Sequence, residues 1–438
     1  MKDRMRKITI ILSLLIFMIS CKTDNIKKYK NHPETQMKNK NKEEFTGTET
    51  ITDSLENEIA KAYKNDFYDS DGDIPEEYSS PNNEKSMKHL AENEFTEGLY
   101  VSAFKVKSKS FPALLDSASG AGLNTVVFDL KNMDGNIFFD FDDKKLKLPH
   151  NKLSIINIPE TVEMLHEKGF RAVARMVMFH DIYIAGEDSS FCPRLKTGKR
   201  WVESKRKKPS WLDSSHPLVQ RDLLELISQA ASQGVDEIQM DYVRFPTQGK
   251  IKDAIFYFQT EDSLKILRDS THIRRKKYDI IKEFCRKAEI ICDRYDVDLT
   301  ADVFAISSWQ RRVDVENTGQ KFSFMTKHLS KIHPMVYSSH FSSNFGYREN
   351  VENEPYDILY KAVSLTDKNS EKDCKVIPYI QANSWKVNYT PEYVAAQITA
   401  IKNAKGKGYL LWNAQSKYFK TLRWIKNWKK ANGYLPAD

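Results

Sequence analysis

The chain has 438 residues, enough for one large domain or two to three ordinary ones. Hydrophobic residues make up 40% of it and aromatic residues 11%, so it can bury a sizeable core, and its low mean hydropathy indicates that a strongly polar segment dilutes a normal globular part. With 68 basic and 60 acidic residues, the net charge of +8 predicts a mixed, soluble surface with a mild bias toward anionic partners and excludes a strongly one-signed surface.

The first 21 residues have the pattern of an export signal. Basic residues precede the apolar run Ile8–Ile19, which is too short for a bilayer-spanning helix of about 20 residues but fits the apolar region of a signal peptide. The run leads into Ser20 and Cys21, and residues 1–21 resemble a bacterial lipoprotein signal peptide. The resemblance implies an exported protein, lipid-anchored through Cys21 to a bacterial membrane on the periplasmic side or at the cell surface. An ordinary cleaved signal with a chance cysteine is the alternative.

Four further cysteines do not indicate a disulfide framework or a metal. Cys285 and Cys292 lie seven residues apart in a helical pattern, about 10 Å along the axis, which is too far for a disulfide. With no CxxC pair to suggest zinc, we expect Cys192, Cys285, Cys292 and Cys374 to be core or surface residues. We expect neither a metal nor a cofactor.

Residues 22–95 are rich in Lys, Asn, Glu, Asp and Ser, and their apolar residues are scattered without a period. This composition predicts a disordered polar tether. A coil of about 70 residues reaches roughly 40–50 Å, enough to hold a domain over residues 96–438 off a membrane.

From about Gly98 onward, an apolar strand, a polar loop and a helix recur. Helical patterns lie between most strands, for example before Gly234 and from the N-cap Thr390 with Pro391 at the first position. The expected strands are Gly98–Phe104, Thr125–Lys131, Arg171–Phe179, Glu237–Phe245, Val297–Phe304, Ile332–Ser338, Val376–Ala382 and Gly408–Asn413.

Eight strands alternating with helices over about 330 residues predict an α/β fold, a (β/α)8 TIM barrel. A doubly wound open sheet is the competing architecture. It normally has fewer strands and a glycine-rich first turn, and no GxGxxG follows Gly98–Phe104. The longer insertions Pro193–Trp211 and Gly249–His272 both follow strand ends, where the active-site loops of a barrel lie.

Three of the expected strands end with an acid that points into the barrel. In VDEIQMDYVRFP, alternation sends Asp241 and Gln239 to one face and Met240 to the other. The same alternation points Asp129 and Asp302 inward. A lone acid at a strand end could be a surface residue, and Asp241 could simply pair with the nearby arginine of the same segment. Three acids on one rim indicate catalysis or cation binding.

Polar and aromatic side chains complete the expected rim. Ring faces stack on the C–H faces of sugars, and carboxylates and amides bind sugar hydroxyls, so this mixture predicts a carbohydrate ligand. Core packing is the alternative for each aromatic residue taken alone. The candidate substrate-binding residues are Arg175, Tyr242, Arg244, His333, Tyr337, Gln381, Trp385, Trp412 and Asn413.

Eight segments also carry a family resemblance. They occur in the order GLYVSAF, VVFDLKNMDG, ARMVMF, EIQMDYVRFP, LTADVF, DVENTGQ, HPMVYSSHF and GYLLWNA. Over about Gly98–Trp424 the chain resembles the bacterial glycosyl hydrolase domain of unknown function, the DUF4015-type TIM-barrel family. The resemblance implies a barrel related to the α-amylase-like glycosidases and a glycoside hydrolase acting on a poly- or oligosaccharide. The chain departs from the family pattern at His180, which stands before Asp181 where a lysine is expected.

A two-carboxylate mechanism follows from the expected positions. The two acids lie about 5–5.5 Å apart in retaining glycosidases and about 6.5–9.5 Å apart in inverting ones. Adjacent strands are about 4.8 Å apart, so Asp241 and Asp302 can reach the retaining distance, and Asp129 lies nearer the inverting range. The hypothesis makes Asp241 the nucleophile or charged stabiliser, kept ionised by Arg175 or Arg244. Asp302 is then the acid/base.

In this scheme Asp129 binds a sugar hydroxyl or serves as the alternative acid. Barrel glycosidases often use Glu as the acid, and no Glu stands at a matching strand end. A non-catalytic glycan-binding lipoprotein on the same scaffold is therefore the alternative.

A metal-dependent hydrolase with Asp129, Asp241, Asp302 and His333 as ligands is less favoured, because zinc barrels usually show HxH on the first strand. The basic clusters Lys196–Lys208 and Arg274–Lys277 fit a solvated face of an exported protein, so we expect no nucleic-acid partner. The sequence does not predict the oligomeric state.

Overall fold

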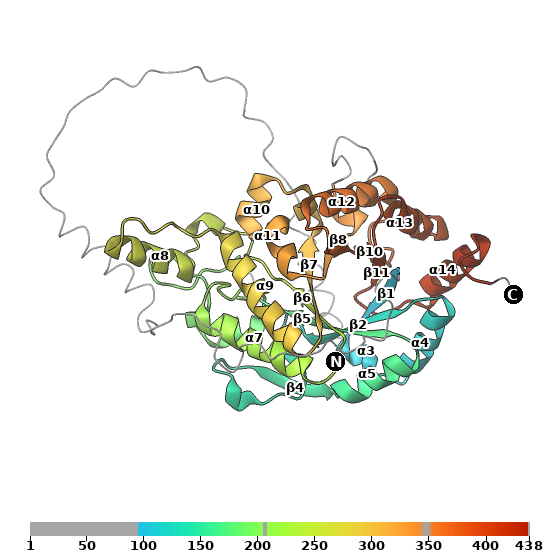
Figure 1. Ribbon diagram of the computed structural model, residues 1–438, viewed down its shortest axis with the longest axis horizontal. Helices are drawn as coiled ribbons and strands as arrows, with labels where there is room; N and C mark the ends of the chain where they lie inside the picture. The colour runs from blue at the N-terminus through green and yellow to red at the C-terminus, as the bar shows by residue number, and fades with distance from the viewer. Residues whose placement is uncertain (1–94, 205–207, 343–344, 346–349, 351, 437–438) are drawn as a thin grey trace, which may run out of the picture. The chain divides into compact units, whose positions relative to one another are not determined.

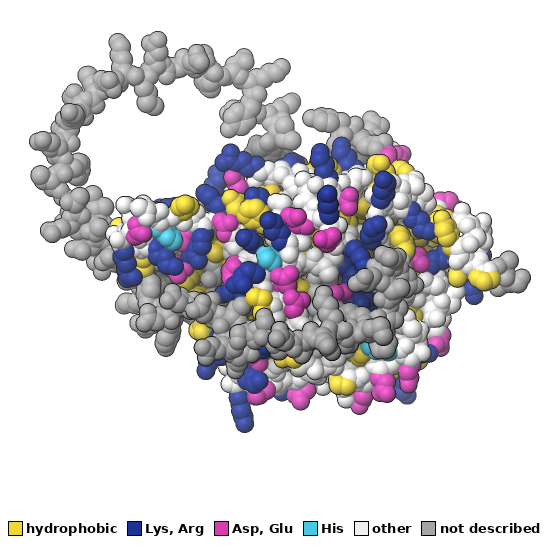
Figure 2. Space-filling model, in the orientation of Figure 1, with side chains coloured by type: hydrophobic (Ala, Val, Ile, Leu, Met, Phe, Trp, Pro, Cys, Tyr) yellow, Lys and Arg dark blue, Asp and Glu magenta, His cyan; other side chains and the backbone are white. Residues whose placement is uncertain are grey.

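A computed structural model of the chain describes residues 95–204, 208–342, 345, 350 and 352–436. The expected signal peptide, Cys21 and all but the last residue of the expected tether lie outside the described residues. Within the described part, no helix is long and apolar enough to cross a membrane. On the face drawn in Figure 2, basic and acidic side chains are interspersed, as the composition predicts.

Eight parallel strands form a closed barrel with helices around it (Figure 1). β1 pairs with both β2 and β11, which closes the ring, so the (β/α)8 TIM barrel is confirmed. In barrel order the strands are β1 (Thr96–Val101), β2 (Thr125–Lys131), β5 (Arg171–Val177), β6 (Glu237–Asp241), β7 (Asp298–Phe304), β8 (Lys331–Val336), β10 (Tyr379–Gln381) and β11 (Gly408–Trp412).

Three short strands extend the sheet beyond the barrel. β3 (Asn136–Phe139) runs antiparallel to β2, β4 (Asn151–Ile156) pairs with β3, and β9 (Lys375–Val376) pairs with β8. β3 and β4 are not among the expected strands, because the NMDG turn folds the chain back against the end of β2 without any long apolar run.

The helices lie between the strands, as the repeat predicts. The Thr390 hydroxyl accepts a hydrogen bond from the N–H of Tyr393, so the predicted N-cap is confirmed. Cys285 and Cys292 are buried on α9 and form no disulfide. The helices are α3 (Ala103–Val106), α4 (Phe111–Gly120), α5 (Ile158–Glu167), α6 (Ile182–Glu187), α7 (Pro217–Ala231), α8 (Tyr257–Arg268), α9 (Lys277–Arg294), α10 (Arg312–Thr318), α11 (Phe322–Met325), α12 (Pro355–Asn369), α13 (Pro391–Asn403) and α14 (Phe419–Ala431).

Side-chain alternation divides the core into two parts. Outward-pointing residues such as Ile238 and Met240 pack under the helices in the large hydrophobic cluster. Inward-pointing residues form a separate, smaller cluster inside the barrel, which includes Val127, Val173 and Tyr379. Gln239 also points inward and accepts a hydrogen bond from the Tyr379 hydroxyl at 2.9 Å. The alternation predicted for the segment around Asp241 therefore matches the fold.

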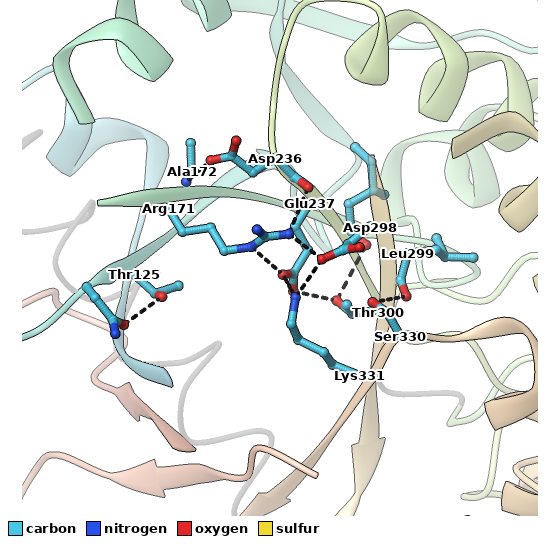
Figure 3. A network of polar contacts seen from close by, with 12 residues as sticks. Thr125, Arg171, Ala172, Asp236, Glu237, Asp298, Leu299, Thr300, Ser330 and Lys331 are labelled. Atoms are coloured by element: carbon cyan, nitrogen blue, oxygen red, sulfur yellow. Dashed lines mark hydrogen bonds and ion pairs between the residues drawn. The ribbon is translucent and has the colours of Figure 1, made fainter. Parts of the chain in front are cut away.

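An ionic layer lies at the amino ends of four neighbouring strands (Figure 3). Lys331 Nζ lies 2.5 Å from Glu237 Oε2 and 2.9 Å from Asp298 Oδ2. Arg171 Nε lies 3.1 Å from Glu237 Oε2, and Arg171 also pairs with Asp298. We call these four residues the floor layer. They pair two cations with two carboxylates, which offsets the cost of burying charge inside the barrel.

Candidate active site

The barrel brings the three predicted acids to one end. Asp129 lies near the carboxyl end of β2, Asp241 ends β6, and Asp302 lies near the carboxyl end of β7. All three are buried, with 2–4% of their surface exposed. Arg175 stands on β5, the strand between β2 and β6.

Arg175 connects the three carboxylates. Its Nη1 donates to Asp129 Oδ1 and its Nη2 to Asp241 Oδ2, each at 2.5 Å. Its Nε lies 3.7 Å from Asp302 Oδ2. The sequence predicted Arg175 near the acids, and the structure places it among all three. A fixed fork of N–H donors suits such a position, because one planar group can hold two carboxylates in defined orientations.

Asp241 also receives a hydrogen bond from the main chain. The N–H of Tyr242 donates to Asp241 Oδ1 at 2.6 Å. Tyr242 has φ of +52°, in the left-handed region that a tyrosine rarely adopts. Backbone strain of this kind persists where surrounding contacts enforce it and is concentrated at functional sites. Here it accompanies a turn that aims an amide at the carboxylate.

The surroundings of the acids affect their pKa values differently. Burial, together with the charge of Asp241, raises the pKa of Asp302 well above its ordinary value. Burial also raises the pKa of Asp129, although Arg175 and the Tyr100 hydroxyl offset part of that effect. Asp302 Oδ1 is buried and has no hydrogen-bond partner among the described residues. Asp302 is therefore the acid of the three that most readily keeps a proton.

Aromatic rings form one wall of the site. Trp412 stacks on Tyr100 with ring centroids 4.3 Å apart and on Tyr337 at 6.2 Å. The guanidinium of Arg175 lies 5.4 Å from the Tyr100 ring centroid and 5.5 Å from that of Trp412. Trp412 is only partly buried, so part of this ring stack is available to a ligand.

Tyr100 is a site residue that the sequence analysis missed. Its hydroxyl donates to Asp129 Oδ2 at 2.5 Å. The alternation of GLYVSAF would have pointed Tyr100 inward, but a single strand pattern does not show which strand lies opposite.

Gln381 and Asn413 bind main-chain groups. Gln381 Nε2 donates to the carbonyls of Asn383 and Trp385 at 3.1 and 3.0 Å. Asn413 Nδ2 donates to the Ala382 carbonyl at 2.8 Å. Both side chains are buried, so they hold the loops after β10 and β11, the first of which carries Trp385.

Trp385 itself is partly buried, and its ring packs edge-on against His340 at 4.9 Å. His333 lies deeper in the barrel, where one ring nitrogen is 2.8 Å from the Ile377 carbonyl and the other is 3.6 Å from Glu237 Oε1. Their predicted binding roles stay predictions.

Arg244 does not serve Asp241 as its ion-pair partner. That partner is Arg175, whereas the Arg244 guanidinium lies over the rings of Phe304 and Trp211 at 4.1 and 4.7 Å. Trp211 comes from the insertion Pro193–Trp211, which reaches the carboxyl ends of the strands as predicted.

Among the described residues, no three or more His, Cys, Asp or Glu side chains are arranged to hold a metal ion. A surface hollow in the described part of the chain is lined by α5 residues such as Val162 and His166 and by Gly234. It lies on the side from which β6 begins, away from the acids. We therefore place the candidate site at the aspartate cluster and not at this hollow.

The fold and the site together define a TIM barrel with acids and aromatic rings at the carboxyl ends of its strands, where barrel enzymes carry their active sites. The chain belongs to the family described as "Putative glycosyl hydrolase domain" (DUF4015), whose model matches residues 98–418. The resemblance seen in the sequence is confirmed.

Solved structures of glycoside hydrolases share the fold. The glycoside hydrolase domain of PgaB (BpsB) from Bordetella bronchiseptica has a TM-score of 0.56 at 12% identity, over 75% of this chain and 98% of that chain. The catalytic domain of β-amylase from Paenibacillus polymyxa has a TM-score of 0.51 at 9% identity, over 78% and 99%. Alpha-L-fucosidase isoenzyme 2 from Paenibacillus thiaminolyticus has a TM-score of 0.50 at 11% identity, over 78% and 50%. At these identities the likeness shows the fold alone. No curated protein matches the chain.

Proposed function

We propose that the protein is a glycoside hydrolase that cleaves a poly- or oligosaccharide with Asp241 as the nucleophile and Asp302 as the acid/base. The observation that carries the proposal is the asymmetry around Arg175. This cation holds Asp241 by a direct ion pair, while Asp302 stays outside hydrogen-bond distance. Asp241 is thereby paired with a cation, whereas burial raises the pKa of Asp302 well above its ordinary value. Glycoside hydrolysis needs two acids whose environments differ in this way.

Asp241 is suited to the nucleophile because its negative charge is fixed by Arg175 and by the Tyr242 N–H. In the first step the carboxylate attacks the anomeric carbon and the bond to the leaving-group oxygen breaks. Asp302 donates its proton to that oxygen. In the second step Asp302 accepts a proton from water, and the hydroxide so formed releases the sugar from Asp241.

The strand register supports a retaining outcome. β6 and β7 are paired with Gln239 opposite Thr300 and Met240 opposite Ala301, and continuing this register sets Asp241 opposite Asp302. Adjacent strands are about 4.8 Å apart, close to the separation of about 5–5.5 Å in retaining enzymes.

Asp129 has a supporting role in this scheme. Tyr100 and Arg175 both donate to it, so it orients the guanidinium and lies where a sugar hydroxyl could be bound. The Trp412 ring supplies an apolar face for the C–H groups of a sugar ring.

A release assay tests the proposal. The full-length protein is incubated with a panel of poly- and oligosaccharides, and new reducing ends are measured for the wild type, Asp241→Asn and Asp302→Asn. Both replacements keep the side-chain volume. We expect loss of about 10²- to 10⁴-fold in kcat for Asp302→Asn and a loss at least as large for Asp241→Asn. Full activity of either variant contradicts the assignment of that residue.

A second candidate function is glycan binding without catalysis. It is favoured by one observation: both oxygens of Asp241 are already engaged, by Arg175 and by Tyr242, and only 4% of the residue is exposed. Measuring glycan binding beside the release assay separates the two functions. Binding to the wild type without any product supports the binding protein.

We further propose that the protein is exported and tethered to a bacterial membrane through lipid on Cys21. The signal-like pattern of residues 1–21 supports this proposal. Expression with a labelled fatty acid tests it: the full-length protein should carry the label and sediment with membranes, and Cys21→Ser should do neither. A labelled Cys21→Ser protein would contradict the anchor.

A further inference from the structure

The buried cations of the barrel domain differ in one respect. In the described part of the chain, five Lys and Arg side chains belong to residues that are at most 8% exposed: Lys131, Arg175, Arg244, Lys331 and Lys429. Four of them have a carboxylate partner: Asp181 at 2.7 Å for Lys131, Asp129 and Asp241 for Arg175, Glu237 and Asp298 for Lys331, and Glu97 for Lys429. Arg244 has none among the described residues. It is therefore a buried charge whose counter-ion is missing.

Aromatic rings surround the Arg244 guanidinium. Ring centroids of Phe304, Trp211 and Tyr242 lie 4.1, 4.7 and 5.3 Å from it. The guanidinium makes one hydrogen bond to the described residues, from Nη1 to the Phe245 carbonyl at 3.0 Å. Rings attract a cation weakly compared with a carboxylate, and burying a charge without an ionic partner costs several kcal/mol. Burial accordingly lowers the pKa of Arg244 to about 10.

An unsatisfied hydrogen-bond donor lies beside Arg244. Trp211 Nε1 is buried and has no acceptor among the described residues. The position of Trp211 is fixed by main-chain bonds on both sides: Asp181 N donates to the Ser210 carbonyl at 2.8 Å, and Leu212 N to the Phe179 carbonyl at 3.0 Å. An orphaned buried donor costs about 1–3 kcal/mol. An anionic acceptor bound here satisfies the Trp211 N–H and balances the charge of Arg244.

These donors lie next to the proposed nucleophile. The N–H of Tyr242 donates to Asp241, and the ring of the same Tyr242 packs against Arg244 and Trp211. Tyr242 is only partly buried. Asp241, Arg244 and Trp211 therefore share Tyr242 as a common neighbour.

We propose that Arg244 and Trp211 bind a carboxylate carried by a sugar of the substrate, so that the enzyme acts on an acidic glycan. This inference rests on the proposed glycosidase function and deepens it. A carboxylate supplies the missing counter-ion of Arg244 and the missing acceptor of Trp211 together. The planar guanidinium fork matches a planar carboxylate. The carboxylates already at the site do not fill this role, since Arg175 holds Asp129 and Asp241.

The charges of Asp241 and Glu203 both act on Arg244, but Arg244 forms an ion pair with neither among the described residues. Arg175 holds Asp241, and Glu203, in the Pro193–Trp211 insertion, is half-buried. Removing its charge should strengthen, or leave unchanged, the binding of an anionic ligand. Glu203→Gln is therefore a matched control at the same site.

Binding to a glycan array tests the inference independently of turnover. The Asp302→Asn protein is used so that ligands are not consumed. The array holds uronic-acid glycans, glycans with lactyl carboxylates, sulfated glycans and neutral glycans. We expect the tightest binding to carboxylated members. Arg244→Gln should weaken that binding about 10- to 100-fold, and Trp211→Phe, which keeps a ring but lacks the N–H, should weaken it by a smaller factor. Binding of neutral glycans should not change.

The array results either support or overturn the binding of a substrate carboxylate by Arg244. Equal binding of sulfated glycans, preferential binding of neutral ones, binding to none, or unchanged binding in Arg244→Gln overturns the inference. If the wild type hydrolyses neutral glycans only, the proposed glycosidase function stands and the inference of an acidic substrate is wrong. Arginine-dependent binding of acidic glycans with no hydrolysis by the wild type supports the inference and overturns the proposed function. Thermal unfolding shows that each variant is folded, because Arg244→Gln removes an unpaired charge and should not lower Tm.

Discussion

Arg175 Nε lies 3.7 Å from Asp302 Oδ2, too far for a hydrogen bond, although the other two nitrogens of the same guanidinium bind carboxylates at 2.5 Å. Neither Arg175 Nε nor Asp302 Oδ1 has a hydrogen-bond partner among the described residues. Asp302 is thus buried beside a cation that is already committed to Asp129 and Asp241. This gap distinguishes the proposed acid/base from the proposed nucleophile.

Replacement of Asp302 by Asn should change how stability depends on pH. Burial and the Asp241 charge raise the pKa of Asp302 in the folded state above its unfolded value. The folded protein therefore holds this proton more tightly, and the stabilisation is complete below the unfolded pKa and lost as pH rises through the folded one. Asn cannot ionise, so the free energy of unfolding of Asp302→Asn should fall less than that of the wild type between about pH 5 and pH 9.

Urea titrations at both pH values measure this effect. Asp129, whose pKa is also raised, is present in both proteins, so both retain its contribution to the pH dependence of unfolding. Parallel pH profiles for the wild type and Asp302→Asn would show that Asp302 is ionised throughout.

Removal of the Arg175 charge should destabilise the barrel strongly. Arg175→Met leaves Asp129 and Asp241 without the cation that pairs with both, and a broken buried ion pair costs about 3–5 kcal/mol. Denaturant unfolding monitored by tryptophan fluorescence measures the loss. Arg175→Lys keeps a charge but loses the fork, so it should recover only part of the stability. A stable Arg175→Met protein would mean that the carboxylates are neutral or solvated.

The floor layer should control how the free energy of unfolding falls at acidic pH. Although burial raises the pKa of Glu237, Lys331, His333 and Arg171 together hold it well below its ordinary value. This stabilisation is present above the unfolded pKa and is lost as pH falls through the folded one. Glu237→Gln should therefore flatten the loss of stability on acidification, as measured by thermal unfolding from about pH 7 to pH 3.

Lys331→Met is the companion variant for this layer. It leaves Glu237 and Asp298 with Arg171 alone and should cost about 3–5 kcal/mol. Adding Glu237→Gln should restore part of that loss, because the uncompensated charge is then gone. An additive double mutant would show that Lys331 and Glu237 do not interact.

Gly135 should be intolerant of a side chain. Its φ is +87°, and a Cβ atom there would lie 2.3 Å from Asp181 Oδ1. Asp181 caps α6 and pairs with buried Lys131 at 2.7 Å. Gly135→Ala should therefore lower Tm by several degrees, and Gly186→Ala, where a Cβ meets nothing within 4 Å, is the control. An unchanged Tm for Gly135→Ala would show that the turn relaxes freely.

The sequence predicts the barrel and the convergence of its acids well, for a physical reason. Parallel strands of a barrel are buried on both sides, so each of the eight strands appears as an apolar run. Alternation then assigns Asp129, Asp241 and Asp302 to the inside from local sequence alone.

Features that depend on register between strands could not be predicted. The floor layer joins Arg171 to Asp298 across 127 positions of sequence, and Tyr100 reaches Asp129 across 29 positions. A single sequence does not state which residues of neighbouring strands lie opposite each other. The amides of Gln381 and Asn413 were expected to bind sugar. In the structure Gln381 binds a main-chain carbonyl of its own loop, and Asn413 binds the Ala382 carbonyl after the neighbouring strand. Loop geometry determined those contacts, and no period of the sequence encodes it.

The central claim is that Asp302 keeps a proton while Asp241 beside it is ionised. ¹³C NMR of protein labelled at the aspartate carboxyl carbons tests it directly, with Asp302→Asn and Asp241→Asn used to assign the two signals. We predict that the Asp302 signal titrates well above the ordinary range of an aspartic acid. An Asp302 signal that titrates in the ordinary range, or two carboxylates ionised together at neutral pH, would contradict the account.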